Sequence, residues 1–395
     1  MRPLFIILSL LIGLVVGLSA AMLLLPALNF YMFALAVGAL EWALWFGLAA
    51  LLGLLLALVG VRATGGWRGA AWLGLGLNLA ALLVIAGVWI LALRSPLLVR
   101  SNMPAVVDGG PGTFGLATFV QGPKTAGDIE VERDVVYATV AGADLKLDVY
   151  RAPDLEASGL HPALVVVHGG SWRTGDKGDL PAFSQALADR GYVVFDVAYR
   201  LAPEARFPAG VADVKCAIGY VKANASRYGI DPGRLVLLGR SAGAQIALVA
   251  AYSANDPELP ASCPAGDTSV RAVISYYAPT RMDYYTVITP ELSPGALDDY
   301  LGGPPETFPD QYRQARPASW IGPATPPTLL LHGSRDQFVR PLDLHELADG
   351  LENAARPYTA IELPWANHGF DYNLTGASSQ RIQPYLDRFL AEVLQ

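Results

Sequence analysis

The chain has 395 residues, of which 53% are hydrophobic and only 16% are charged, with a formal net charge of -7. This balance is too apolar for an ordinary soluble protein, and no basic cluster of the kind that binds nucleic acid is present. Charged residues are rare before residue 94 and common after it. The sequence therefore predicts a transmembrane region at residues 1–95, a linker at 96–130 and a globular α/β domain at 131–395.

Three apolar runs in the first region are candidates for membrane-spanning helices. The runs 4–25 and 72–93 carry no charged residue and are long enough to cross a bilayer. The apolar stretch that follows the first run has Glu41 as its only charge. The simplest division makes 42–61 the second span and leaves 26–41 as an apolar connector, at the membrane surface or partly re-entrant. A four-span division would instead split this stretch into two helices, each short for a bilayer.

The charges that flank these runs bear on processing and orientation. Arg2, an apolar core and the small residues around Ser19 also resemble a cleavable signal peptide, although the core is long for one and two further spans follow. With three spans, the amino terminus, Arg62 and Arg68 share one side, while Arg94 and the globular domain share the other. The slight positive excess on the first side favours a cytoplasmic amino terminus. We expect an integral protein of a bacterial-type cell membrane with an extracytoplasmic globular domain.

The two cysteines leave the redox compartment open. Cys216 falls in a helical pattern and Cys263 in a loop that contains Pro and Gly. These positions allow a disulfide without requiring one, and they lack the spacing of metal ligands.

Short apolar segments alternate with helical patterns through the globular part. Residues 135–140 and 145–150, separated by a short turn, predict an antiparallel hairpin. Fully apolar strands then alternate with helices, which indicates a mostly parallel sheet covered by helices on both faces. The irregular stretch 280–327, rich in aromatic residues, is a candidate cap over a site, and packing of its aromatics against the core is an equally good alternative.

A G-x-S-x-G pattern lies at the centre of the globular part, between an apolar strand and an Ala-rich helix. Its residues are Gly239, Arg240, Ser241, Ala242 and Gly243. In a sharp strand-to-helix turn the two glycines relieve crowding and leave the serine hydroxyl exposed. Ser241 is therefore a candidate nucleophile, and this role requires a base, an orienting acid and an anion-stabilising loop elsewhere in the chain.

The sequence HGGSW at 168–172 directly follows an apolar strand. It therefore lies at the carboxyl edge of the sheet, where the serine must also emerge, and its glycines let backbone N–H groups approach a substrate oxygen. A plain glycine turn is the alternative. The predicted oxyanion hole consists of Gly169, Gly170, Ser171 and Ala242.

A histidine and an aspartate occur where a base and an acid are needed. Of the five histidines, His368 is the one that lies in a loop between the last strand and the final helix, from which it can reach over the sheet edge. It is the candidate base, with a structural histidine as the alternative. Asp336 follows a strand and lies between the serine and the histidine in chain order, so it is the candidate acid. The other nearby acidic residues fit helix surfaces or a strand interior.

These motifs resemble the α/β-hydrolase superfamily, and within it the carboxylesterases related to hormone-sensitive lipase and the bacterial esterases with an H-G-G-x-W loop. The resemblance covers residues 131–394 and leaves the membrane spans outside. It implies Ser241 as nucleophile, Asp336 and His368 as its partners, and 169–171 as the oxyanion loop. It rests on five segments in the family's order: HGGSWRTGDK, DVAYRLAPEARFPAGVAD, YGIDPGRLVLLGRSAGA, HGSRDQFV and NHGF.

The resemblance implies acyl transfer to Ser241, assisted by His368, and hydrolysis of the acyl-enzyme by water, without a metal or an organic cofactor. Trp172 and Trp365 flank the expected site in sequence and are candidates for lining an acyl or alcohol pocket, with core packing as the alternative. The membrane region favours a small-molecule or lipid-like ester as substrate and the bilayer as partner. The competing functions are a serine peptidase or amidase of the same superfamily and a non-catalytic membrane sensor.

Overall fold

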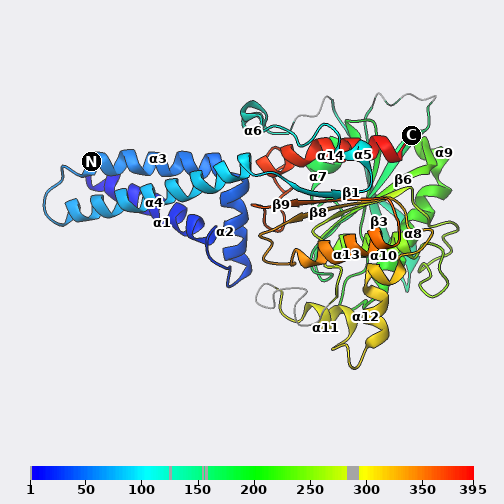
Figure 1. The fold of residues 1–395 in the computed structure, drawn as a ribbon. Coiled ribbons are helices and arrows are strands. Elements are labelled where there is room, and N and C mark those ends of the chain that lie inside the picture. The colour runs from blue at the N-terminus through cyan, green and yellow to red at the C-terminus, as the bar shows by residue number, and fades with distance from the viewer. Residues whose placement is uncertain (1, 124–126, 154, 156–158, 283–292) are drawn as a thin grey trace.

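A computed structural model of the chain describes every residue except 1, 124–126, 154, 156–158 and 283–292. An elongated helical region at the amino-terminal end adjoins a larger globular region built on one sheet (Figure 1). The carboxyl terminus lies on the side of the globular region that faces away from the helical region.

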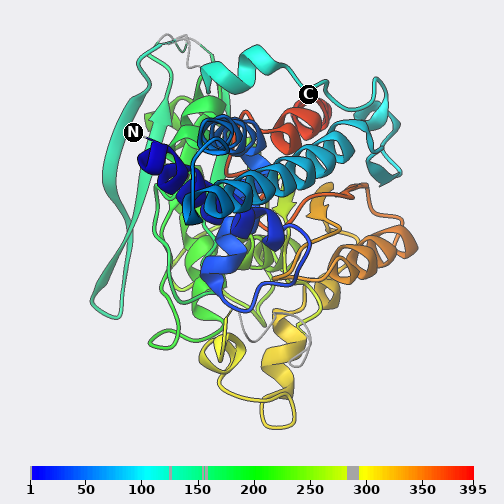
Figure 2. The ribbon, with the colours of Figure 1, turned by 90° about the vertical axis from the view of Figure 1, so that its left-hand side faces the viewer.

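The helical region consists of α1 (Arg2–Met22), α2 (Phe30–Glu41), α3 (Ala43–Gly60) and α4 (Gly66–Arg94). Among the described residues, α1, α3 and α4 are the three helices long and apolar enough to cross a membrane. At about 1.5 Å per residue, the 12 residues of α2 extend only about 18 Å, short of a hydrocarbon core about 30 Å thick. The expected connector is therefore a short helix, and it lies across the end of the bundle next to the globular region (Figures 1 and 2).

The three long helices pack against one another through small residues and a buried polar cluster. Asn78 Nδ2 on α4 donates to the carbonyl oxygens of Ser9 (3.0 Å) and Gly74 (2.8 Å), and Ser9 Oγ donates to that of Gly53 (2.8 Å). A Cβ at Gly53 would lie 2.1 Å from Asn78 Oδ1, so only glycine permits this approach. Close crossings of this kind are typical of helices packed in a membrane. Many leucines of these helices are exposed, and Leu11, Leu14, Leu55 and Leu83 are each more than half exposed.

The described residues of the globular region form a nine-stranded mixed sheet of order β1-β9-β8-β7-β6-β4-β5-β3-β2. Its strands are β1 (Leu98–Ser101), β2 (Glu130–Val140), β3 (Ala143–Arg151), β4 (His161–Val167), β5 (Val193–Val197), β6 (Ile230–Arg240), β7 (Ala272–Tyr276), β8 (Thr328–Gly333) and β9 (Tyr358–Leu363). Strands β4 to β9 run parallel, whereas β1 and the β2–β3 hairpin run antiparallel at the two edges. The prediction of a mostly parallel sheet with an antiparallel hairpin at one edge is confirmed.

The segment 96–130, expected as a linker, is partly built into the fold. Strand β1 pairs with β9, with Val99 opposite Ile361, and it extends the sheet by one strand. The segment also contains the short helices α5 (Pro104–Val107) and α6 (Leu116–Gln121). A strand of four residues next to Pro and Asn carries too little periodicity to be recognised from the sequence.

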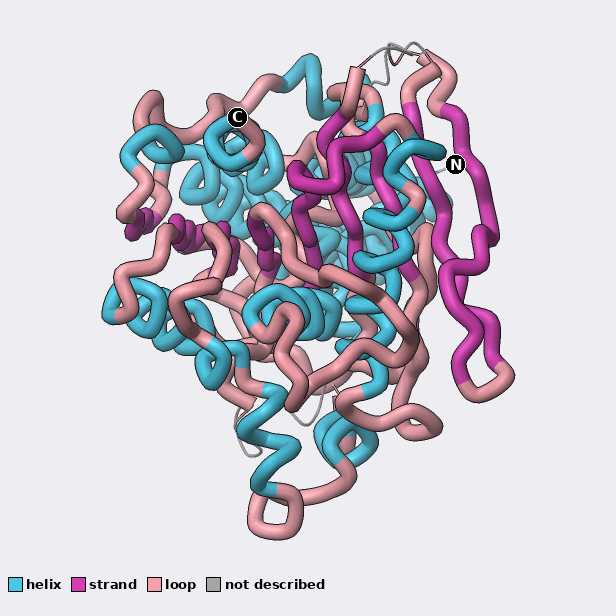
Figure 3. The backbone as a smooth tube through the Cα atoms, turned by 90° about the vertical axis from the view of Figure 1, so that its right-hand side faces the viewer, coloured by secondary structure: helices cyan, strands magenta, loops and turns pink. Residues whose placement is uncertain are grey.

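Helices cover both faces of the sheet (Figure 3). The larger ones are α7 (Pro181–Ala188), α8 (Ala209–Ala223), α10 (Ala242–Tyr252), α13 (Leu342–Asn353) and α14 (Ala377–Val393). Alternate residues of β4 pack into two separate cores. Val165 belongs to the core that includes α8, α10 and α13, and Leu164 belongs to the core that includes α7 and α14. The expected cap contributes small helices, and its residues 283–292 lie outside the described residues. The remaining short elements are α9 (Ala225–Tyr228), α11 (Ala296–Leu301), α12 (Pro309–Ala315) and η1 (Pro317–Trp320).

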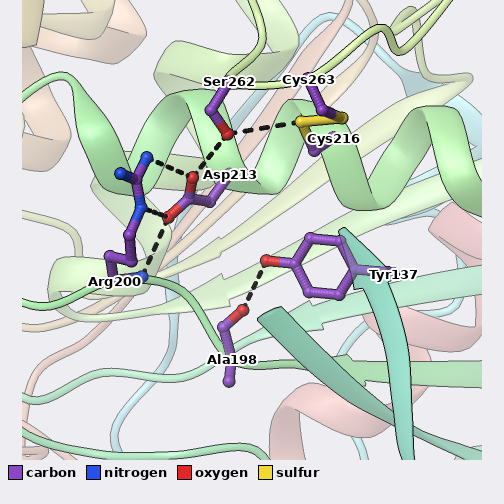
Figure 4. The surroundings of a disulfide bond; sticks show 7 residues. All are labelled: Tyr137, Ala198, Arg200, Asp213, Cys216, Ser262 and Cys263. Carbon is purple, nitrogen blue, oxygen red and sulfur yellow. Dashed lines mark hydrogen bonds and ion pairs between the residues drawn. A yellow bond between two sulfur atoms is a disulfide. The ribbon is translucent and has the colours of Figure 1, made fainter. Parts of the chain in front are cut away.

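A disulfide joins Cys216 on α8 to Cys263 in the loop before β7 (Figure 4). Beside it, Arg200 donates to both carboxylate oxygens of Asp213, from Nε at 2.9 Å and from Nη2 at 2.7 Å. Ser262 Oγ donates to the same carboxylate at 2.6 Å. The pairing that the sequence left open is thus present, and it ties the loop before β7 to α8.

Candidate active site

Ser241 occupies the sharp turn between β6 and α10, with φ 52° and ψ -124°. Positive φ is strained for a residue with a side chain and persists where the surroundings enforce it. A Cβ at Gly239 would lie 2.3 Å from the carbonyl oxygen of Gly243, and one at Gly243 would lie 2.1 Å from that of His168. Both glycines of the G-x-S-x-G pattern are therefore required by close backbone contacts.

The three side chains predicted to act together meet at the carboxyl edge of the sheet. Ser241 Oγ lies 2.9 Å from His368 Nε2, and His368 Nδ1 lies 2.7 Å from Asp336 Oδ2. His368 belongs to the loop after β9, and Asp336 to the loop after β8. The other carboxylate oxygen of Asp336 accepts hydrogen bonds from the backbone N–H groups of Phe338 and Val339, both at 2.8 Å. The carboxylate is thereby fixed toward the imidazole.

Two further residues support this arrangement. Asn367 Oδ1 accepts hydrogen bonds from the backbone N–H of His368 (2.8 Å) and from the loop that carries the aspartate (2.9 Å). His332, at the end of β8, lies with Nε2 3.0 Å from the carbonyl oxygen of Val339 and 3.4 Å from Asp336 Oδ2. Burial lowers the pKa of His332, so it is neutral near pH 7 and does not compete as a cation for the carboxylate. His332 was not selected from the sequence, although its spacing of four residues from Asp336 was an available signal.

The predicted oxyanion loop lies beside the serine. A Cβ at Gly169 would lie 3.2 Å from Ser241 Cβ, which shows how closely the two turns approach. Gly170 and Ser171 adopt φ values of 117° and 52°, and within the described part of the chain their N–H groups donate no backbone hydrogen bond. Ala242 begins α10, so its N–H lies at a helix amino terminus, where anions are favoured. This loop has the N–H groups that an oxyanion would need.

Ser241 and His368 line a cavity of about 650 Å³, called here the Ser241 cavity. The predicted oxyanion loop forms part of it, together with Phe338 and Tyr277. One wall comes from α2 and the residue after it, a contribution that sequence reasoning missed. The wall residues that α2 and the residue after it contribute are Phe30, Phe33, Ala34, Val37, Gly38 and Trp42.

In the described residues no group of three or more His, Cys, Asp or Glu side chains is arranged to hold a metal ion.

The two tryptophans proposed as pocket residues lie elsewhere. Trp172 is buried, its Nε1 donates to Gln245 Oε1 at 2.9 Å, and its ring stacks on Tyr300 at 4.4 Å. Trp365 is buried as well, and its Nε1 donates to Ser378 Oγ at 3.1 Å. Neither is among the described residues that line the Ser241 cavity. The structure contradicts that expectation and supports core packing instead, because each indole N–H has a buried partner.

A buried ion pair involves the residue that precedes Ser241. Arg240 Nε lies 2.5 Å from Asp371 Oδ2, and the Arg240 guanidinium lies 4.0 Å from the ring centroid of Phe183. Tyr277 Oη donates to Asp371 Oδ1 at 2.5 Å, and its ring centroid lies 4.3 Å from that of His368. Burial raises the pKa of Tyr277 well above its usual value, so the hydroxyl remains a donor. The pair thus links the residue before the serine to a ring that contacts the base.

Part of this chain matches a known protein family. The BD-FAE family matches residues 147–351, just over half of the chain. The chain belongs to the BD-FAE family. This family's match includes Ser241 and Asp336 and ends before His368, and α2 lies well outside it.

Curated relatives of this BD-FAE member include esterases. It is 32% identical over 272 residues to the "Probable carboxylic ester hydrolase LipM" and 34% identical over 255 residues to the "Esterase LipC", both of Mycobacterium tuberculosis. The matches cover 67% and 62% of this chain and 62% of each relative, so the chain spans less than two thirds of their length.

A solved structure of similar fold is Est2, a thermophilic esterase from Thermogutta terrifontis. It is 25% identical to this chain, with a TM-score of 0.54, and the match covers 69% of this chain and 95% of Est2. Est2 has also been solved with propionate bound. The resemblance to α/β-hydrolase carboxylesterases is confirmed, and it concerns the globular region.

Proposed function

We propose that this BD-FAE family member is a membrane-anchored carboxylic ester hydrolase that acts through an acyl-enzyme on Ser241. The observation that carries the proposal is the hydrogen-bonded series from Asp336 through His368 to Ser241 Oγ, of which His368 and Ser241 line a cavity of about 650 Å³. A serine hydroxyl is a poor nucleophile unless an adjacent base accepts its proton and a third group orients that base. The relatives that carry the name esterase support an ester as the bond that is cleaved.

In the first half-reaction, Ser241 Oγ attacks the ester carbonyl carbon while His368 Nε2 takes the hydroxyl proton. The carbonyl oxygen becomes an oxyanion, for which the N–H groups of Gly170, Ser171 and Ala242 are the proposed donors. Removing one such donor typically raises the barrier by about 3–4 kcal/mol. His368 then protonates the departing alcohol, which leaves an acyl-enzyme.

In the second half-reaction, water replaces the alcohol. His368 Nε2 takes a proton from the water, the resulting hydroxide attacks the acyl carbonyl, and the proton returns to Ser241 Oγ as the carboxylic acid leaves. Asp336 accepts the Nδ1–H of His368 in both halves and stabilises the imidazolium, which is consistent with its 2.7 Å contact.

The test uses the full chain in lipid nanodiscs and a small fluorophosphonate that reacts with activated serines. We expect wild type to label and to hydrolyse 4-nitrophenyl butyrate, and the Ser241→Ala variant to do neither. Absence of labelling in wild type, or equal labelling of Ser241→Ala, would reject the proposal. A short acyl ester is tested first because Est2 has been solved with propionate bound. A matched butyryl anilide addresses the amidase alternative, which faster amide than ester cleavage would favour.

We also propose that α1, α3 and α4 cross the membrane, that the chain divides at about residue 95, and that the hydrolase domain is extracytoplasmic. The amino terminus and the α3–α4 turn lie at the end of the bundle away from the globular region (Figure 1). Arg2 begins α1, Arg62 lies in this turn and Arg68 lies in the first turn of α4, and positive charges favour the cytoplasmic side. The disulfide is consistent with an oxidising compartment. A carboxyl-terminal alkaline phosphatase fusion, active only outside the cytoplasm, should be active; an inactive fusion would reverse the orientation.

A further inference from the structure

Helix α2 brings part of the membrane region into direct contact with the catalytic residues. Its side chains line the Ser241 cavity, and they are apolar throughout the contact. The ring centroid of Phe33 lies 5.2 Å from that of Phe338 and 6.4 Å from that of His368. Ala34 is exposed yet lines the cavity, so its methyl group faces open space in which a ligand can lie.

Polar contacts at both ends hold α2 against the globular region. Before the helix, the backbone N–H of Ala27 donates to Gln337 Oε1 at 2.6 Å, and Gln337 adjoins Asp336 in sequence. At the end of the helix, Ser378 Oγ donates to Glu41 Oε1 at 2.7 Å, and Asn373 Nδ2 donates to the Glu41 carbonyl oxygen at 2.7 Å. Buried hydrogen bonds of this kind fix position more than they add net stability. Helix α2 is therefore held in place as one wall of the Ser241 cavity.

With the proposed spans, the same helix lies at the membrane surface. It connects two proposed spans and crosses the end of their bundle (Figures 1 and 2), so it lies along the plane in which the bilayer would end. Leu28 and Phe30 are exposed, and Tyr31 is 81% exposed. Aromatic and apolar side chains at this level are favoured at a membrane interface. Since Phe30 also lines the Ser241 cavity, the apolar wall continues from the cavity to the surface.

Polar side chains also line the Ser241 cavity. Arg173, Thr174 and Asp179 line it, and Arg173 Nη1 lies 3.0 Å from Asp299 Oδ2. A cavity lined both by an apolar helix and by polar side chains matches a ligand that has an apolar and a polar part, and its volume of about 650 Å³ suits a molecule larger than a short ester. We infer that the substrate is an amphiphilic ester held in the bilayer, whose hydrocarbon chain lies along α2 while its carbonyl meets Ser241. This inference rests on the proposed hydrolase function and names its substrate class.

The experiment narrows the Ser241 cavity at the α2 wall and compares esters that differ in chain length. The full chain in nanodiscs receives ethyl butyrate, butyl decanoate with a long acyl chain, and decyl butyrate with a long alcohol. Ala34→Phe fills the open space, and Gly38→Leu is a second narrowing variant, because a Cβ there meets only Phe46 Cζ at 4.0 Å. Tyr31→Trp is the control, since it enlarges a residue of α2 that does not line the Ser241 cavity.

We expect wild type to cleave at least one decyl ester with a higher kcat/KM than ethyl butyrate. Displacing two or more methylene groups from the wall should lower that value by about tenfold or more in Ala34→Phe and Gly38→Leu. Both variants should lose less activity toward ethyl butyrate, so the ratio of the kcat/KM for the decyl ester to that for ethyl butyrate should fall by about fivefold or more, since a short ester makes less use of the wall. Fluorophosphonate labelling of Ser241 reports whether each variant is folded.

Several outcomes would overturn the inference and leave the hydrolase function intact. The first is a wild type that cleaves only ethyl butyrate. The second is that the narrowing variants lower kcat/KM equally for all three esters while they label normally. The third is that they change kcat/KM for none of the esters. An equal loss in Tyr31→Trp would also overturn it. A wild type that neither labels nor cleaves any ester would instead refute the proposed function itself.

Discussion

The buried ion pair between Arg240 and Asp371 offers a direct measure of how the nucleophile turn is held. The two side chains are 5% and 3% exposed, and Nε and Oδ2 lie 2.5 Å apart. The other carboxylate oxygen accepts the Tyr277 hydroxyl. Asp371→Asn keeps nearly the same volume but removes the negative charge. The guanidinium would then remain buried without a counter-charge, in the residue that precedes Ser241.

The expected cost follows from this burial. Removing one partner of a buried ion pair typically costs about 3–5 kcal/mol, because the remaining charge is still desolvated. For a domain of this size, about 2 °C of the thermal midpoint corresponds to 1 kcal/mol, so the midpoint should fall by about 6–10 °C. Tyr277→Phe removes a single hydrogen bond to the same carboxylate and should cost less, about 1.5–3 kcal/mol.

The assay heats the nanodisc-bound chain to graded temperatures and measures the fraction of Ser241 that still reacts with a fluorophosphonate. Asp387→Asn is the matched control, because Asp387 forms an exposed pair with Arg190 at 2.9 Å. Exposed pairs contribute about 0–1 kcal/mol, so this variant should shift the midpoint by about 2 °C at most. If Asp371→Asn shifts the midpoint no further than Asp387→Asn, the buried pair does not stabilise the turn as argued.

Three further predictions concern the acid, the disulfide and a buried lysine. Asp336→Asn should lower kcat for ester hydrolysis by about 10⁴-fold, because the imidazole loses the partner that orients it; a loss under about tenfold would contradict that role. Cys216→Ser removes a cross-link over a separation of 47 residues, and loop entropy sets the expected loss in the free energy of unfolding at about 4 kcal/mol. Its thermal midpoint should match that of reduced wild type, and no shift on reduction would contradict the estimate. Burial lowers the pKa of Lys215 to about 8, below its value in the unfolded chain, so between pH 8 and pH 10 the unfolded state binds more protons. Wild type should therefore lose stability as pH falls from 10 to 8, by up to about 1.4 kcal/mol per pH unit, and thermal midpoints of Lys215→Met should lack this slope.

The meeting of Ser241, Asp336 and His368 was predictable because each residue follows a strand of one parallel sheet. Carboxyl ends of parallel strands share an edge, so chain order and strand position suffice to bring distant residues together. The supporting contacts depend on detail that no pattern carries. Whether Asp371 would reach Arg240, or His332 would lie near the carboxylate, depends on loop conformations that only the packed structure fixes.

The errors have physical causes as well. Trp172 directly follows the oxyanion loop, so nearness in sequence suggested a pocket role. Its own φ is 61° and that of Ser171 is 52°, and after this turn the indole lies in the core against Tyr300. The wall formed by α2 was missed for another reason. Apolar side chains such as Phe33 are equally suited to lipid, core or cavity, so composition alone does not distinguish these surroundings.

The position of α2 joins the amino-terminal helical region to the Ser241 cavity. Phe33 and Val37 are buried against the globular region, where they belong to the same core as the strands that carry the site. Without residues 1–95, Phe338 would lose the contact with Phe33, and the Ser241 cavity would lose its apolar wall. The triad residues would remain, because their hydrogen bonds lie within the globular region. The amino-terminal helical region therefore completes the Ser241 cavity, in which the proposed function places the hydrocarbon chain of the substrate.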